Sequence, residues 1–185
     1  MKPKLFILVL ALQTAWLLGT AFTQERALRV GQIILLETQP VDPRDLLRGD
    51  FVRLNYKISD VPRERFFSPP LTGELLAGPT VFVALAPVGT NEFYQLARAS
   101  TEWFAPASNE VVLRGRTAHS WRNSPGSVHV EYGLEQYFVA EGTGNPRGKL
   151  TVQAAVTKSG RASIKEVFVD AKPYAEAMKA QGPVK

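Results

Sequence analysis

The segment Pro40–Ile58 reads PVDPRDLLRGDFVRLNYKI and joins a turn to the clearest strand pattern in the chain. Asp42 and Pro43 have the form of an N-cap and a first helical residue, and Gly49 the form of a helix end, so one helical turn is predicted between them. The following side chains alternate between two faces, with Val52, Leu54, Tyr56 and Ile58 on one and Phe51, Arg53, Asn55 and Lys57 on the other. This period of two predicts a half-buried strand over residues 50–58.

Charged side chains are dense around this turn. Asp50 enters the strand on its apolar face, so we expect its carboxylate to accept backbone hydrogen bonds or to pair with an arginine. The full cluster comprises Asp42, Arg44, Asp45, Arg48, Asp50 and Arg53. Such carboxylates could act as an acid/base pair or bind a cation such as calcium. Because arginines alternate with them, we favour a capped turn with surface ion pairs, and we expect neither a metal nor a cofactor.

A family resemblance accompanies this segment. The chain resembles the GDYXXLXY family, whose motif spacing is matched by Gly49, Asp50, Phe51, Leu54 and Tyr56, with Phe51 in place of the motif's first tyrosine. Pro40–Arg48 and Tyr132–Val139 also resemble family segments, so the similarity covers most of the chain. The resemblance implies a small membrane-anchored bacterial protein without an assigned activity, which accompanies a multi-spanning membrane protein. The candidate binding or motif residues are Asp42, Pro43, Arg44, Asp45, Arg48, Gly49, Asp50, Phe51, Leu54 and Tyr56.

Residues 1–23 predict a membrane anchor. Lys2 and Lys4 precede the apolar run LFILVLALQTAWLLGTAF, which is about long enough to cross a bilayer. Lysines on this side predict a cytoplasmic N-terminus and an extracytoplasmic, periplasmic domain. Gly19 and Ala21 also fit a signal-peptidase site, so cleavage near Phe22 is the alternative. We favour an uncleaved transmembrane helix because the run is longer than a usual signal core.

Composition limits the remaining choices. The formal charge is +5, and Lys2 and Lys4 account for two of these charges, which leaves a modest excess on the rest of the chain. No basic block or basic-aromatic stripe typical of nucleic-acid binding is present, so no nucleic-acid partner is expected. The chain has no cysteine, which excludes disulfides and thiolate chemistry.

Short apolar segments separated by turn residues predict a single all-β domain over residues 24–169, a β-sandwich or partly open barrel. Residues 24–29 form a polar connector before the first strand. In the strand 111–117, Arg114 and Arg116 share a face, and Gly115 is expected to leave a gap opposite them. Residues 132–136 could instead form a short helix, and residues 170–185 a short helical or disordered tail. The predicted strands are 33–38, 50–58, 80–86, 93–99, 111–117, 127–132, 134–139, 150–157 and 162–169.

Three functions fit these features. The first is a membrane-anchored extracytoplasmic binding or accessory domain that partners an integral membrane protein, with Arg44, Arg48 and Arg53 facing headgroups or an acidic partner. The second is a hydrolase that uses Asp50 with His129 or Glu131, which share a strand face. His119 would add a third ligand if these residues held a metal, which two histidines alone support weakly. The third is a lipid- or small-molecule-binding barrel lined by Phe66, Phe67, Tyr132 and Tyr137, although we expect Phe66 and Phe67 to serve packing.

Overall fold

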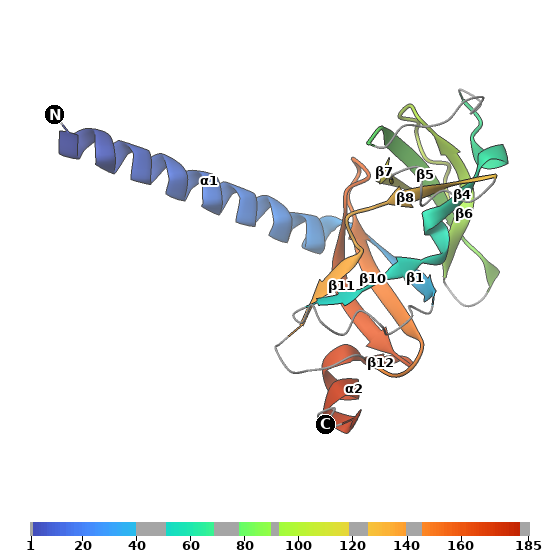
Figure 1. Ribbon diagram of the computed structural model, residues 1–185. Coiled ribbons are helices and arrows are strands. Elements are labelled where there is room, and N and C mark those ends of the chain that lie inside the picture. Colours follow the sequence, from blue (N-terminus) through green and yellow to red (C-terminus); the bar gives the residue numbers. More distant parts are fainter. Residues whose placement is uncertain are drawn as a thin grey trace.

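The computed structural model describes residues 2–39, 51–68, 78–89, 93–118, 126–139 and 146–181. Helix α1 (Lys2–Val30) projects away from a body of strands, as Figure 1 shows. Within it, Lys4–Val30 is long and apolar enough to cross a membrane, and none of its most apolar window is buried. The hydroxyls of Thr14, Thr20 and Thr23 donate to carbonyls of the preceding turn, which satisfies polar groups inside an apolar helix. The helix also continues through residues 24–29, where the sequence indicated a connector.

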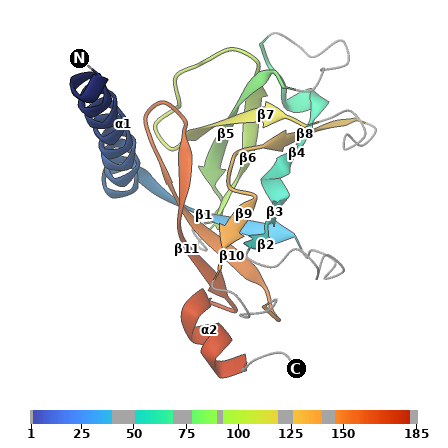
Figure 2. The ribbon, with the colours of Figure 1, turned by 60° about the vertical axis from the view of Figure 1, so that its left-hand side comes forward.

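The strands of the described residues form two larger sheets and one small one (Figure 2). The first has the order β12-β11-β10-β1-β3 and the second the order β4-β8-β7-β5-β6, while β2 pairs with β9. Their bounds are β1 (Gln32–Gln39), β2 (Phe51–Arg53), β3 (Asn55–Tyr56), β4 (Asp60–Pro62), β5 (Thr80–Pro87), β6 (Tyr94–Ser100), β7 (Val111–Thr117), β8 (Ser127–Glu131), β9 (Gln136–Phe138), β10 (Leu150–Val156), β11 (Ala162–Val169) and β12 (Lys172–Pro173).

The two larger sheets curve around a common core to form a nearly closed barrel. A parallel bridge between Leu35 and Phe93 brings β1 beside the start of β6, and the segment 51–62 crosses from the first sheet to the second. The interior is filled by side chains from both sheets, including Leu36, Val83 and Val152, all of which are fully buried. The all-β fold with a partly open barrel after an apolar N-terminal helix is therefore confirmed.

The predicted strand 50–58 is correct in its faces and wrong in its continuity. Val52, Leu54, Tyr56 and Ile58 are all buried, as the alternation indicated. However, the chain is divided into β2, β3, the 3-10 helix η1 (Lys57–Ser59) and β4, each of which has a different neighbour. The division arises because this segment passes from one sheet to the other, so no single strand partner can follow it.

The other predicted strands are present, with local corrections. The segment 134–139 contributes only β9, and residues 132–136 are not helical. Gly115 leaves no gap: a Cβ at this position would collide with Val130 Cγ1 and approach the Glu131 carbonyl oxygen to 3.0 Å. Glycine therefore allows β8 to lie tightly against β7. The second 3-10 helix, η2 (Arg63–Arg65), follows β4.

Helix α2 (Tyr174–Gln181) confirms the short C-terminal helix. Its residues Tyr174, Ala177 and Met178 are buried in the core cluster, and the Tyr174 ring meets Tyr137 edge-on at 5.3 Å between centroids. Figure 2 places α2 beyond the end of β11 opposite the hairpin turn. The helix is thus a packed part of the domain.

Candidate functional site

Part of the family motif interlocks with the turn that contains Tyr132–Glu135. The Leu54 amide donates to the Glu135 carbonyl at 2.8 Å, and the Tyr56 hydroxyl donates to the Leu134 carbonyl at 2.7 Å. In the opposite direction, the Tyr132 hydroxyl donates to the Ile58 carbonyl at 2.7 Å. We call these residues, Leu54–Ile58 and Tyr132–Glu135, the motif clasp. Its bonds join segments about 75 residues apart, where each covers polar groups that the other could not satisfy alone.

The turn of the clasp is closed by its own glutamate. Glu135 Oε1 accepts a hydrogen bond from the Tyr132 amide at 2.6 Å, and Gly133 between them has a φ of 79°. A positive φ of this size favours glycine, which explains its place in the turn. The antiparallel pairing of β2 with β9 then extends the clasp, with Phe51 opposite Phe138 and their ring centroids 6.3 Å apart.

The two tyrosines of the clasp serve as neutral hydrogen-bond donors. Burial raises the pKa of Tyr56 far above its usual value, and the nearby Glu135 carboxylate raises it further. The pKa of Tyr132 is also raised well above its usual value by burial, with smaller contributions from Glu135 and Asp60. Neither phenol can therefore exchange a proton near neutral pH, and both are suited to a structural role.

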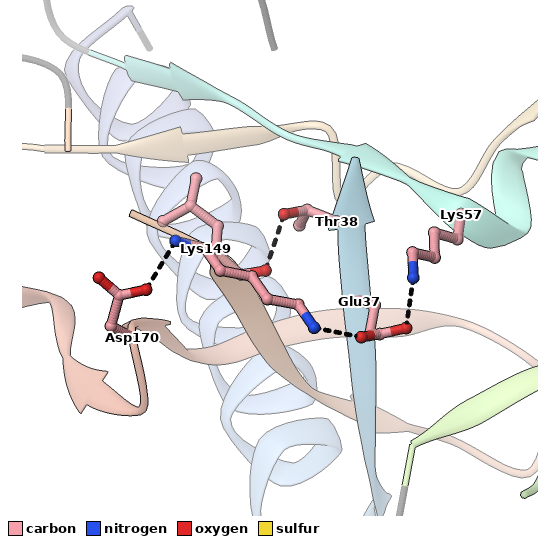
Figure 3. A network of polar contacts seen from close by, with 6 residues as sticks. Glu37, Thr38, Lys57, Lys149 and Asp170 are labelled. Atoms are coloured by element: carbon pink, nitrogen blue, oxygen red, sulfur yellow. Dashed lines mark hydrogen bonds and ion pairs between the residues drawn. The ribbon is translucent and has the colours of Figure 1, made fainter. Parts of the chain in front are cut away.

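A second polar cluster lies on the first sheet and was not found from the sequence (Figure 3). Glu37 on β1 accepts hydrogen bonds from Lys57 at 2.8 Å and from Lys149 at 2.5 Å. The Lys149 amide in turn donates to Asp170 at 2.8 Å, and the hydroxyl of Thr38 donates to the Leu150 carbonyl at 2.8 Å. The hydrogen bonds from Lys149 and then Lys57 hold the pKa of Glu37 below its usual value. The cluster links β1, η1 and β10 by a carboxylate that stays ionised.

The histidine predicted as a catalytic candidate has a different carboxylate partner. His129 Nδ1 lies 2.8 Å from Asp60 Oδ1, and the two residues face each other across β4 and β8. Glu131 shares the strand face of His129 as expected, but lies opposite Arg116 in the register of β7 and β8. Among the described residues, no group of three acidic or histidine side chains could hold a metal ion. The geometry thus supports a His–Asp pair in place of the predicted pairing with Glu131.

The four aromatic residues proposed to line a pocket make separate contacts. Phe66 is buried in the core, which confirms the packing role expected for it. Phe67 is 44 % exposed and meets Phe104 edge-on, and the guanidinium of Arg98 lies 5.0 Å from its ring centroid. The Tyr132 hydroxyl is engaged in the motif clasp, and Tyr137 packs on Tyr174.

Only part of the predicted site lies in the described residues. Phe51, Leu54 and Tyr56 do, and of these Leu54 and Tyr56 are the ones brought into the clasp. Sequence reasoning missed the roles of Tyr132 and Glu135, although both lie in the segment that resembles the family. The candidates outside the described residues are Asp42, Pro43, Arg44, Asp45, Arg48, Gly49 and Asp50, together with His119.

The clasp joins two segments that carry the resemblance noted in the sequence, and the comparison with known families agrees with it. The family model described as GDYXXLXY protein matches residues 13–167, which is most of the chain. The chain belongs to the GDYXXLXY family. No curated protein and no solved structure matches it. The GDYXXLXY match covers part of α1 and nearly all of the barrel, so helix and barrel belong to one family unit.

Proposed function

We propose that this GDYXXLXY protein is a membrane-anchored accessory domain that binds an integral membrane protein. The observation that carries the proposal is a contrast in burial. The motif side chains Leu54 and Tyr56 are 0 % and 1 % exposed and form bonds within the chain, whereas the apolar window of α1 is entirely uncovered. A motif that holds the fold together leaves contact with a partner to the helix and the outer surface of the barrel.

The anchor is the part of the proposal closest to the observations. An apolar helix of this length is stable when lipid surrounds it, because its backbone bonds are all internal. Within the bilayer, close packing with a second apolar helix would come from van der Waals contact and interhelical hydrogen bonds. We place the barrel on the extracytoplasmic, periplasmic side because Lys2 and Lys4 precede the apolar run.

Isolation of the full chain from native membranes in a mild detergent tests this function. We expect an integral membrane protein to co-purify in a fixed ratio. A matched control keeps the barrel but replaces residues 5–22 with an unrelated apolar span of the same length. If the partner contacts α1, the control stays in the membrane and loses the partner, and if it contacts the barrel, the control retains it. A chain isolated alone in both forms would overturn the proposal.

A hydrolase is the second candidate, and the His129–Asp60 pair is the observation that favours it. A carboxylate at 2.8 Å can orient an imidazole and stabilise its protonated form, as a general base requires. The Asp60→Asn variant would then abolish turnover of a substrate while the melting temperature changes little. In the accessory domain, the same variant keeps its partner. A lipid or other small molecule that co-purifies with the intact chain would support the third function, a binding barrel.

A further inference from the structure

The turn between β10 and β11 lies at the end of the barrel from which α1 leaves. One residue, Gly31, separates α1 from β1, and Gln32 at the start of β1 pairs with Val156 at the end of β10. Because β1 and β10 are antiparallel, β10 runs back toward the helix, and both β10 and β11 contact α1. Residues 157–161 therefore follow at the helix-proximal end of the sheet.

This turn is fixed against the second sheet. The Arg114 amide on β7 donates to the Gly160 carbonyl at 2.8 Å, and the Thr157 amide donates to the Arg161 carbonyl at 2.9 Å. Gly160 has a φ of 80° and is buried close to the β7 backbone, where a Cβ would lie only 3.1 Å from Val112 O. Lys158 and Arg161 flank this contact and are exposed. Figure 1 shows the turn beside β7.

Aromatic side chains continue this surface on the second sheet. Arg114 is exposed and lies directly opposite Phe82 in the register of β5 and β7. The Phe82 ring meets Trp103 edge-on, with 5.3 Å between centroids, and Trp103 is 49 % exposed. A continuous path thus runs from the helix exit through the turn to Trp103. We call Phe82, Trp103, Arg114, Lys158 and Arg161 the basic-aromatic patch.

The patch carries positive charge that the barrel does not neutralise. Within the part of the chain that the structure describes, Arg114, Lys158 and Arg161 form no ion pair. The last turns of α1 add Arg26 and Arg29, of which Arg29 is paired with Glu25 at 2.6 Å. With Glu102 beside Trp103 included, five cations face two carboxylates along this path.

We propose that the basic-aromatic patch docks the barrel onto anionic lipid headgroups of the bilayer that α1 enters, an inference that rests on the proposed anchor. The apolar run ends at Phe22, so Arg26 lies about 6 Å farther along the helix, within the headgroup layer. Basic side chains near this layer are within about one Debye length, ~10 Å, of its charge. Tryptophan is enriched at the same depth because its ring is apolar and its N–H is polar. Each lysine or arginine near the surface contributes about a fivefold preference for anionic lipid.

The absence of cysteine in the sequence allows a direct test in the full chain. A fluorophore attached through Ser159→Cys would report the position of the turn in vesicles that carry a quencher on the headgroups. We expect stronger quenching with about 30 mol % phosphatidylglycerol in phosphatidylcholine than with phosphatidylcholine alone, and loss of the difference at about 1 M salt. The pair Lys158→Gln/Arg161→Gln should lower the ratio of docked to undocked barrels by up to about 25-fold.

A matched pair removes the same charge elsewhere. Lys172 and Lys179 are exposed and lie on β12 and α2, so Lys172→Gln/Lys179→Gln should leave quenching unchanged. Equal effects of the two pairs, or quenching independent of lipid charge in a chain that stays in the vesicles, would overturn the inference alone. A chain that never enters the vesicles would overturn the proposed anchor together with it. Loss of a protein partner in the Lys158→Gln/Arg161→Gln pair, without a change in quenching, would assign the patch to protein binding and overturn lipid docking.

Discussion

The motif clasp and the basic-aromatic patch use polar groups in opposite ways. In the clasp, the hydroxyls of Tyr56 and Tyr132 are buried, neutral and bonded to backbone carbonyls. In the patch, Arg114, Lys158 and Arg161 are exposed and charged. A buried hydroxyl contributes to the fold because an unmet carbonyl would be costly, whereas an exposed cation adds little to stability and stays available to a partner. The difference separates residues that build the barrel from residues that can connect it to its surroundings.

Removal of the Tyr56 side chain should give the largest effect on this contrast. Tyr56→Ala leaves a cavity at a position that is 1 % exposed and also leaves the Leu134 carbonyl without its donor. We expect the free energy of unfolding to fall by about 4 kcal/mol. Chemical denaturation of the full chain in detergent measures this change. A loss below about 1 kcal/mol would contradict the structural role of the clasp.

Removal of the Tyr56 hydroxyl alone tests the hydrogen bond of the clasp. Tyr56→Phe keeps the ring and leaves a buried carbonyl unsatisfied, so we expect a loss of about 2 kcal/mol. Tyr137→Phe is the matched control, because Tyr137 packs its ring on Tyr174 and the structure gives its hydroxyl no hydrogen bond among the described residues. Equal losses in the two variants would show that the bond to Leu134 contributes nothing specific.

The Glu37 cluster lies between the two regions in character, since it is charged but only 16 % exposed. Its folded pKa is lowered by Lys149 and Lys57, so its contribution is present above the ordinary carboxyl pKa of 4.5 and is lost as the pH falls below it. We expect Glu37→Gln to cost about 1 kcal/mol at neutral pH, because both lysines are more than half exposed. Denaturation between about pH 7 and pH 3 should show the wild type and the variant converging in acid. A constant difference across this range would rule out the ion pairs as its cause.

Charge removal in the patch should have the smallest effect on stability. We expect Lys158→Gln/Arg161→Gln to change the free energy of unfolding by less than about 0.5 kcal/mol, because both side chains are exposed and form no ion pair within the described residues. Thermal melting in a neutral detergent measures this. A loss as large as that of Tyr56→Phe would erase the contrast between the clasp and the patch and show that the turn itself holds the sheets together.

The sequence predicted which side chains of the motif are buried, and it did not predict how the motif strand is divided. Alternation places Val52 and Leu54 on one face whether or not the strand is continuous, because each residue of an extended chain turns by half a revolution. The break after Arg53 depends on β9, β1 and β8, which pair with successive pieces of the segment. The same limit applies to Gly115, where only the approach of Val130 excludes a gap.

Local patterns in the sequence by themselves determined the apolar helix, the strand faces, the hairpin turn at 158–161 and the family motif. Each depends on neighbours within a few residues, through hydropathy, alternation or the conformational freedom of glycine. Only the tertiary structure decided that His129 meets Asp60, that Glu37 meets Lys149 and that the clasp joins Tyr56 to Leu134, because these partners are 69, 112 and 78 residues apart. Contacts at such separation are set by strand order and register, which are properties of the closed barrel as a whole.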